Sequence, residues 1–288
     1  MKFLNTASKF AGIGLLFGLV LVSCQKLDKP GMGDYPKDTN PPGGPLKFFA
    51  AFDGSTADPL RNGVDSIRAN FPSSNTATTT DGVSGKGYKG SETAFAQYSA
   101  ANDFAASTSF TIAFWLKKTP QAAGKGTNFA FGLNAGGYSW TNLKLFLEFE
   151  DAGNPSTTDS AAVKFYLLDQ WFEFIGTKRM KNVLNGSWHH LAFTYDETTS
   201  VLKTYIDGAI PTNLPADFGK VMNGASPRGK LDFTSGNSLS GFTVGGPGTT
   251  AHDANTWMNN FDGQLDQFRL YSKVLSAADI TALYTNKQ

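Results

Sequence analysis

Three short segments place a tryptophan beside amide, hydroxyl or carboxylate side chains, a combination that suits sugar recognition. They are Tyr138-Ser-Trp140-Thr-Asn142, Asp169-Gln170-Trp171 and Asn255-Thr-Trp257. Aromatic rings stack on the apolar C–H faces of sugar rings, while polar side chains bond the hydroxyl groups. We therefore predict these ligand-binding residues: Tyr138, Trp140, Asn142, Trp171 and Trp257. Packing in the core is the other interpretation, and it stays open for each tryptophan.

The three histidines do not form a metal site by this reading. His189 and His190 are adjacent in WHHLAFTYD, so on a strand their side chains face opposite sides. His252 lies in the polar segment TTAHDANTW, and zinc needs more ligands than the chain offers. Cys24 is the single cysteine, so the rest of the chain has no disulfide or thiolate chemistry.

The elements that must position these residues are β-strands. In SFTIAFWLK, residues 109–117, apolar residues alternate, and period two predicts a strand with one buried side. Residues 143–150 and 188–196 alternate in the same way. Further strands are predicted at residues 46–52, 163–168, 171–176, 201–208, 230–233, 241–246 and 263–271. Many short strands separated by turn formers favour a sandwich or barrel.

One short helix is predicted at the C-terminal end of the chain. Ser276-Ala-Ala-Asp279 is a capping box before Ile280–Tyr284, which predicts one short C-terminal helix.

The charges of the chain are balanced. The chain has 25 Lys and Arg against 24 Asp and Glu, a formal net charge of +1. This balance gives no electrostatic footprint for nucleic acid, so we expect no nucleic-acid partner.

Four segments resemble the concanavalin A-like lectin/glucanase superfamily, specifically its laminin-G-like jelly-roll domains. The segments are FDGSTADPLRNG (52–63), SFTIAFWLK, WHHLAFTYD with VLKTYIDG, and FDGQLDQFRLYSKVLSAADITALY (261–284). The resemblance extends from about Phe48 to Tyr284. It implies an all-β fold, a two-sheet antiparallel jelly-roll sandwich with one short C-terminal helix.

The same resemblance implies a structural calcium ion. Asp266 should share a strand face with Phe268 and Leu270, and a carboxylate on an apolar face needs a partner. Related domains often hold Ca²⁺ with oxygen ligands, and the matching positions here are Asp58, Asn62 and Asp266. The sequence departs from the family pattern in two places, since Pro59-Leu60-Arg61 and Gln267 replace the usual residues. A salt bridge to Arg61 or a backbone-capped carboxylate therefore remains an open alternative.

Catalysis is not predicted. Glucanases of the superfamily carry an E-x-D-x-E strand, because two carboxylates must flank the scissile bond. Here the nearest segment is Glu148-Phe-Glu150-Asp151, and the third carboxylate would fall at Ala152. Asp169 and Glu173 lack a middle carboxylate. Glycan hydrolysis is kept as a second alternative function.

The start of the chain is typical of an export signal. Lys2 and Lys9 precede an apolar stretch from Phe10 to Val22, which is too short to span about 30 Å of hydrocarbon. Leu21-Val22-Ser23-Cys24 resembles the bacterial lipobox, which implies lipid on Cys24. We predict a signal peptide at 1–23, a Pro/Gly-rich tether at 24–45 and a folded domain at 46–288.

Together these features predict an exported, carbohydrate-binding, lectin-like protein without catalysis that is lipid-anchored to the bacterial outer membrane at the cell surface. Its expected partners are a polysaccharide or glycan and, through the lipid, the membrane. The first alternative is a protein-binding, adhesion or structural module with an envelope protein partner, because the same sandwich serves in assembly without touching sugar.

Overall fold

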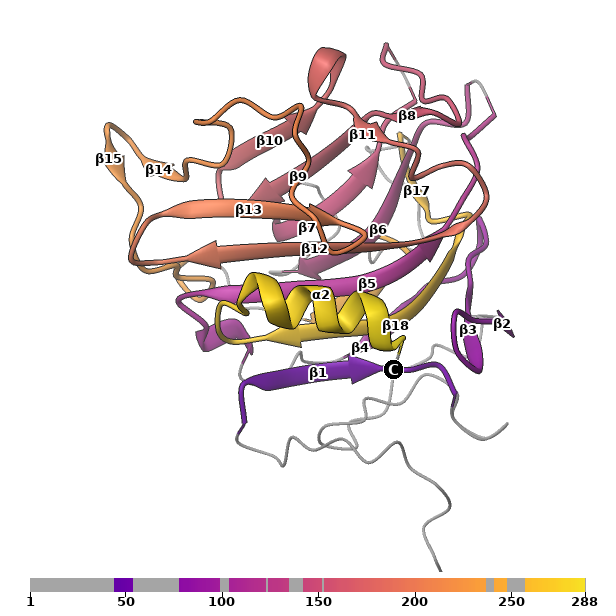
Figure 1. Ribbon diagram of the computed structural model, residues 1–288, viewed down its shortest axis with the longest axis horizontal. Coiled ribbons are helices and arrows are strands. Elements are labelled where there is room, and N and C mark those ends of the chain that lie inside the picture. The colour runs from indigo at the N-terminus through magenta and orange to yellow at the C-terminus, as the bar shows by residue number, and fades with distance from the viewer. Residues whose placement is uncertain are drawn as a thin grey trace, which may run out of the picture. The chain divides into compact units, whose positions relative to one another are not determined.

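The computed structural model describes residues 44–53, 78–98, 104–122, 124–134, 142–151, 153–236, 241–247 and 257–287. The chain divides into two units, Met1–Thr39 and Asn40–Gln288, and every described residue belongs to the second. In that unit two seven-stranded sheets form an antiparallel jelly-roll sandwich with one helix (Figure 1). This confirms the fold class predicted from the sequence.

Sheet 1 has the strand order β13-β12-β5-β18-β3-β2, with β1 paired to β18. Its strands are β1 (Leu46–Ala50), β2 (Thr78–Asp81), β3 (Lys86–Lys89), β5 (Phe110–Lys117), β12 (Trp188–Asp196), β13 (Val201–Ile206) and β18 (Gln264–Tyr271). The two strongest alternating segments of the sequence, β5 and β12, pair along eight residues from Phe110 to Lys117. Strong alternation therefore marks the centre of this sheet.

Sheet 2 has the order β10-β9-β7-β6-β16-β4, and the short β17 runs parallel to β6. Its strands are β4 (Ala96–Tyr98), β6 (Thr127–Asn134), β7 (Leu143–Phe149), β9 (Val163–Leu167), β10 (Gln170–Phe174), β16 (Gly241–Val244) and β17 (Met258–Asn260). Two small ladders join β8 (Ser160–Ala161) to β11 (Met180–Lys181) and β14 (Met222–Asn223) to β15 (Ser226–Pro227). The 3-10 turns are η1 (Phe104–Ala106) and η3 (Gly176–Lys178).

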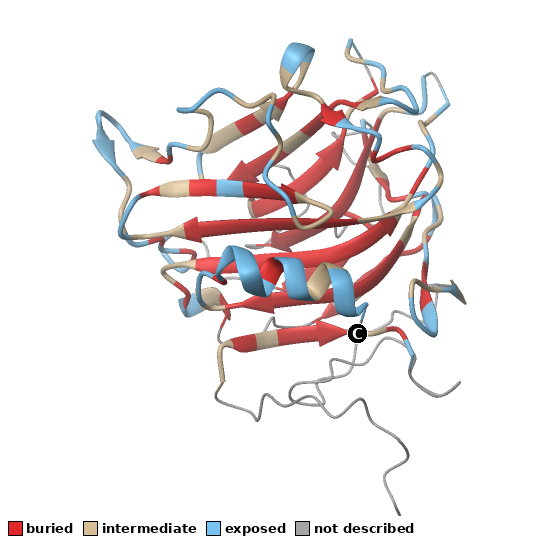
Figure 2. Cartoon of the chain, viewed as in Figure 1, coloured by how far each residue is buried: buried red, intermediate tan, exposed pale blue. Residues whose placement is uncertain are grey.

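The core lies between the sheets and is built largely from phenylalanine. Phe131 on β6 bridges the two sheets, with its ring 5.7 Å from that of Phe114 and 5.3 Å from that of Phe268 on sheet 1. Phe165 and Phe242 of sheet 2 lie 6.4 and 6.3 Å from the same ring. Figure 2 shows the buried strands of both sheets meeting in this layer. Three of these four ring pairs are edge-on, and such contacts add to the stabilisation from burial itself.

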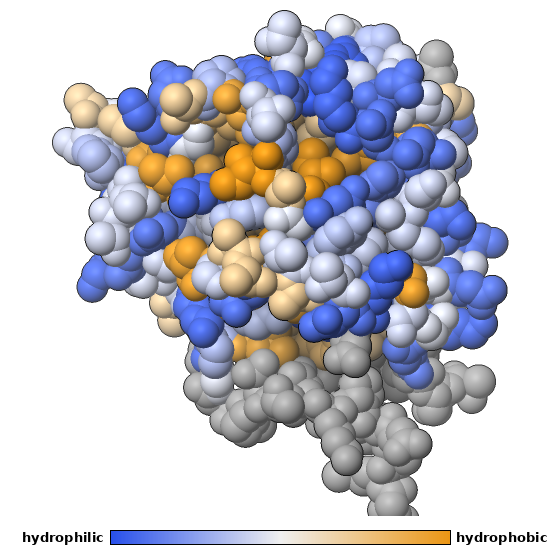
Figure 3. Space-filling view, in the orientation of Figure 1, coloured by the Kyte–Doolittle hydropathy of each residue, from blue (hydrophilic) through white to orange (hydrophobic). Residues whose placement is uncertain are grey.

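Helix α2 (Ala277–Asn286) covers the outer face of sheet 1. Ser276 caps it through the predicted capping box, Ile280 is buried against the sheet, and Tyr284 stacks on Trp115 at 5.6 Å. Figure 3 shows this side of the molecule, where the most apolar atoms gather not on the helix but between β13 and β10. No helix in the described part of the chain is long and apolar enough to cross a membrane.

Residues 230–233 do not form the predicted strand. Leu231 and Phe233 are buried in the core, as their apolar character suggests, but the backbone turns at once. The carboxylate of Asp232 accepts from the backbone N–H groups of Thr234 and Ser235 at 2.8 and 3.0 Å. An aspartate that bonds the next backbone groups in this way initiates a turn, which overrides the strand propensity.

Candidate functional site

The outer face of sheet 2 carries polar and aromatic side chains in two cross-strand rows. Along β7, Leu145 and Leu147 belong to the core, so the intervening Phe146 and Glu148 point to the outer face. The same alternation holds on β9 and β10, where Phe165 and Phe172 belong to the core. Helix α2 packs on the outer face of sheet 1, whereas the outer face of sheet 2 carries these two rows.

The aromatic row consists of Phe146, Tyr166 and Trp171, which are direct partners on β7, β9 and β10. The rings of Phe146 and Tyr166 stack at 4.9 Å, and Trp171 meets them edge-on at 5.3 and 4.9 Å. Phe146 and Tyr166 are buried, whereas Trp171 is half-buried. The row therefore holds one partly accessible indole in a fixed orientation.

The charged row, Glu148, Lys164 and Glu173, lies directly beside the aromatic row on the same strands. Lys164 Nζ is 2.6 Å from Glu150 Oε1 and 3.6 Å from Glu173 Oε1. The same nitrogen is 5.5 Å from the centre of the Trp171 ring. A cation and two carboxylates thus border the accessible indole, which gives the face donors and acceptors for hydroxyl groups.

Glu148 differs from Lys164 and Glu173 because its side chain is buried. Its residue is 1 % exposed, and its Oε2 has no hydrogen-bond partner among the described residues. Burial raises the pKa of Glu148 to about 8, and the carboxylates of Glu150 and Glu173 act in the same direction, against Lys164. Glu148 is therefore mainly a neutral acid at pH 7.

Trp257 joins the same aromatic cluster from another direction. It immediately precedes β17, is 36 % exposed, and its ring lies 5.6 Å from that of Phe129. Phe129 in turn lies 5.1 Å from Phe146. Two tryptophans that are distant in sequence, Trp171 and Trp257, therefore pack against one connected group of rings.

The other predicted ligand residues do not join this cluster in the structure. Asn142 precedes β7 and is four residues from Phe146, or about 13 Å along a strand. Tyr138 and Trp140 lie outside the described residues, as do Asp58, Asn62 and Cys24. The structure thus links Trp171 to Trp257 through the rings of Phe146 and Phe129, and it places Asn142 before the start of β7.

Asp266 does not share the face of Phe268 and Leu270, which corrects the expectation from the sequence. The register between β18 and β5 shifts between Asp266 and Arg269, and Gln267 has a φ of 48°. This bulge adds one residue, so Leu265 and Phe268 both face the core while Asp266 turns away. Asp266 is nevertheless fully buried, beneath the turn that joins β2 to β3.

The turn caps one oxygen of the Asp266 carboxylate with backbone N–H groups, as in the alternative that the sequence left open, and leaves the other oxygen available to a cation. Its Oδ2 accepts from the N–H groups of Val83 and Ser84 at 2.7 and 3.3 Å, whereas its Oδ1 has no partner among the described residues. Burial, with a smaller contribution from the charge of Asp53, raises the pKa of Asp266 to about 7, while backbone hydrogen bonds act in the opposite direction. Asp53 lies against the same turn, where its carboxylate accepts from Lys86 N–H.

Gly82 makes this close approach feasible. A Cβ at residue 82 would lie 2.4 Å from Asp266 Oδ2, so the turn can cover the carboxylate only without a side chain there. In the described part of the chain, no group of three His, Cys, Asp or Glu side chains gathers around a metal position. A cation at this turn would therefore rely on the Asp53 and Asp266 carboxylates together with backbone oxygens.

The two adjacent histidines face opposite sides, as predicted. His189 Nδ1 lies 2.8 Å from Asp207 Oδ2, in the turn after β13. The ring of His190 is buried against Trp115, and its two nitrogens have no hydrogen-bond partner among the described residues. Burial lowers the pKa of His190 to about 4, so it packs as a neutral ring.

Sequence reasoning missed Lys164, Tyr166, Phe146 and Asp53 as site residues. The first three occupy alternate positions of β7 and β9 that face outward. Only the strand pairing shows that Lys164 lies opposite Glu148 and that Tyr166 lies opposite Phe146 and Trp171. Asp53 stands next to the predicted first strand, but the sequence assigned the metal to Asp58 and Asn62 further along the same loop.

A family model described as the concanavalin A-like lectin/glucanases superfamily matches residues 89–281. The search of curated proteins finds no match. Among solved structures, the chain is similar to domain 4 of AbnA, a GH43 extracellular arabinanase from Geobacillus stearothermophilus, in complex with arabinotriose. That similarity has a TM-score of 0.50 at 19% identity and covers 83% of this chain and 98% of the other.

Two other solved structures show the same fold. The binding domain of Paraclostridial Mosquitocidal Protein 1 matches with a TM-score of 0.54 at 14% identity, over 84% of this chain and 52% of that one. Trypanosoma rangeli sialidase matches with a TM-score of 0.53 at 15% identity, over 84% of this chain. The chain spans 33% of that sialidase.

Proposed function

The chain belongs to the concanavalin A-like lectin/glucanases superfamily, and from this premise we propose that it binds a glycan on the outer face of sheet 2. The observation that carries the proposal is the half-buried Trp171, oriented by Phe146 and Tyr166 and bordered by Lys164 and Glu173. A rigid indole can stack on a sugar ring, while the charged row bonds its hydroxyl groups. The solved arabinanase domain with arabinotriose supports the glycan class by analogy.

Replacing Trp171 with alanine should weaken glycan binding by about 30-fold, corresponding to about 2 kcal/mol for a central aromatic contact. Affinity electrophoresis against a panel of glycans, with calcium present, would identify the ligand, and titration calorimetry would measure the change. Lys203→Ala is the matched control, because Lys203 is exposed on β13 of the other sheet. Equal binding by the Trp171 variant and the unaltered chain would refute this site, and no retardation by any glycan would refute the function.

Hydrolysis is the second candidate, favoured by one observation: Glu148 is a neutral acid on the same face as Glu150. A glycosidase needs such an acid beside a carboxylate. Binding without catalysis remains our proposal, because the sealed Glu148 carboxyl does not reach the surface where a glycosidic oxygen would lie. Long incubation with the bound glycan, followed by product analysis, separates the two, since products lost in Glu148→Gln would establish hydrolysis.

We also propose that Asp266 and Asp53 hold a structural calcium ion beneath the turn between β2 and β3. Support comes from the buried Asp266 Oδ1, which lacks a partner among the described residues, and from the proximity of two carboxylates. Calcium prefers oxygen ligands in flexible geometry and would offset their mutual repulsion. The ion would fix the turn to β18 without taking part in glycan recognition.

The cellular setting is likewise proposed from the sequence. Cleavage before Cys24 and lipid on its thiol would anchor the protein to the outer membrane, with the segment 24–45 as a spacer reaching up to ~60 Å. Cys24→Ser should move the protein from the membrane fraction to the soluble fraction of cells. If the variant stays in the membrane fraction, the lipid anchor on Cys24 is wrong.

A further inference from the structure

Lys118 is a lysine buried between the two sheets. It directly follows β5 of sheet 1, and its side chain is 2 % exposed. Lysine is almost never fully buried, because an ammonium group loses its hydration there. Burial lowers the pKa of Lys118 to about 7, so much of the amine is neutral and nucleophilic at neutral pH. The glycan site on the outer face of sheet 2 does not use this residue.

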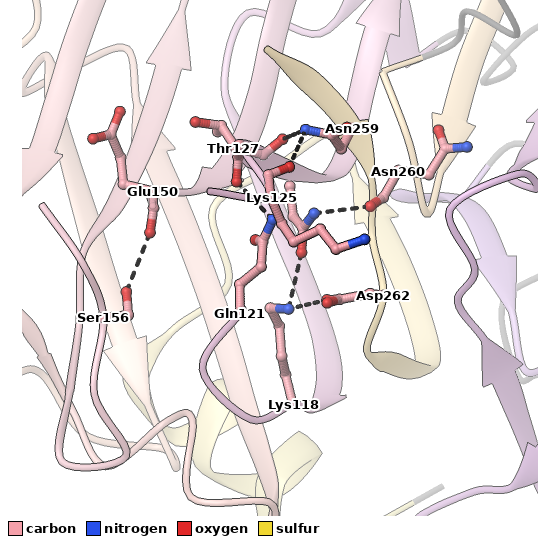
Figure 4. Close-up of polar contacts among 11 residues, drawn as sticks. Lys118, Gln121, Lys125, Thr127, Glu150, Ser156, Asn259, Asn260 and Asp262 are labelled. Carbon is pink, nitrogen blue, oxygen red and sulfur yellow. Dashed lines mark hydrogen bonds and ion pairs between the residues drawn. The ribbon is translucent and has the colours of Figure 1, made fainter. Parts of the chain in front are cut away.

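The amine has two polar neighbours (Figure 4). Lys118 Nζ donates to Asn128 Oδ1 at 2.9 Å, and it contacts the carboxylate of Asp262. Asn128 is the second residue of β6 in sheet 2 and is 3 % exposed. Its Nδ2 donates to the carbonyl of Asn260 at 3.0 Å, which fixes the orientation of the amide. An amine, a carboxamide and a carboxylate therefore converge from three segments of the chain.

This arrangement is close to the geometry of a reaction. A C=O bond is about 1.23 Å long, so Asn128 Cγ lies within about 4.1 Å of the Lys118 nitrogen. Reacting atoms held at about 3–3.5 Å behave as if at roughly 10⁵–10⁸ M, and a small rotation of either side chain would bring Nζ from Oδ1 into that range of Cγ. The Phe261 ring lies 5.4 Å from the amine and gives these polar groups an apolar neighbour. Only Asp262 reaches the solvent, with 39 % of its side chain exposed.

We propose that Lys118 and Asn128 form an intramolecular isopeptide bond, with Asp262 as the group that transfers the proton. The neutral Nζ attacks Cγ of Asn128, and the Asp262 carboxylate accepts a proton from the nitrogen. The carboxylic acid then returns that proton to the Nδ2 group as the C–N bond breaks. The products are a secondary amide between Nζ and Cγ and one molecule of ammonia, so no oxidant or cofactor is needed.

The bond would join the end of β5 in sheet 1 to the start of β6 in sheet 2. It closes the segment between residues 118 and 128 covalently and ties one layer of the sandwich to the other. The chain has no cysteine beyond Cys24, so no disulfide can serve this purpose. A cross-link of this kind restricts the unfolded chain in the way that a disulfide does.

Peptide mapping of the purified full chain by mass spectrometry tests the proposal. Trypsin does not cleave after an acylated lysine, so we expect a branched peptide that joins residues 118–125 to residues 126–144. Its mass should equal that of the two linear peptides less one ammonia. Separate peptides with cleavage after Lys118 would overturn the proposal and leave an ordinary ion pair. A branch at Asp262, formed with loss of water, would overturn the assignment to Asn128.

Variants distinguish chemistry from folding. Asn128→Ala should abolish the branched peptide, and Asp262→Asn, which keeps both reacting groups, should lower its rate of formation at least tenfold. Lys86→Ala is the control, because Lys86 forms an exposed pair with Asp81, and it should leave the branched peptide intact. Unchanged cross-linking in Asp262→Asn would overturn the role of the carboxylate.

Discussion

Phe131→Ala is expected to lower the free energy of unfolding by about 3–5 kcal/mol, the usual range for removing a buried phenylalanine ring. The ring touches Phe114 and Phe268 of the opposite sheet as well as Phe165 and Phe242 of its own. Alanine would leave a cavity at the point where both sheets meet, and the surrounding rings are held by their strands. Urea denaturation followed by circular dichroism measures the loss.

The matched control for this variant is Ile210→Ala. Ile210 is 51 % exposed, so its truncation should change the free energy of unfolding by no more than about 0.5 kcal/mol. A loss below about 1 kcal/mol for Phe131→Ala would contradict the packing of sheet 2 on sheet 1 through this ring.

Calcium removal should have the second large effect. Burial raises the pKa of Asp266 from its ordinary value of 3.8 to about 7, so the metal-free folded state favours the protonated acid. Protonation of Asp266 therefore stabilises the metal-free fold fully below about pH 3.8, and this stabilisation is lost as the pH rises to about 7. The change in the free energy of unfolding is on the order of 4 kcal/mol. A bound calcium ion would reverse this penalty above pH 7, because it stabilises the carboxylate.

We therefore expect the melting temperature at pH 8 to fall on chelation, with calcium at about 100 times its Kd contributing about 2.7 kcal/mol. Asp266→Asn should not respond to calcium, and without the metal it should be more stable than the unaltered chain at pH 8. Asp217→Asn is the control, since Asp217 is exposed and should leave the response intact. A melting temperature that is the same with calcium and with chelator would exclude the site.

Local patterns predicted the strands that matter most to the sandwich. Alternating apolar residues placed β5, β7 and β12 within a residue of their observed bounds, and the capping box placed α2. The central strand β6 was missed, because its segment TNFAFGLN contains Gly132 and asparagines that resemble a loop. Glycine is favoured at residue 132 because a Cβ there would lie only 3.3 and 3.4 Å from the side chains of Leu143 and Thr243. That requirement arises only from neighbouring strands.

The candidate site depended more heavily on tertiary structure. The sequence indicated Trp171 and Trp257 as candidates for sugar contact, but their convergence on one aromatic cluster is a consequence of how β10 and β17 pair. The wrong prediction of the strand face on which Asp266 lies has a similar origin. A single residue with a left-handed backbone, Gln267, reverses which side chains face the core, and the sequence has no signal for this bulge.

The sequence by itself determined the fold class, the alternating faces of the principal strands and the types of side chain available, because these follow from short-range periodicity and residue chemistry. Tertiary structure decided which groups meet: Glu148 with Lys164, Asp266 with the backbone of Val83, and Lys118 with Asn128. Those encounters depend on register between strands that are distant in the chain. A shift of one residue would turn every side chain of a strand to the opposite face.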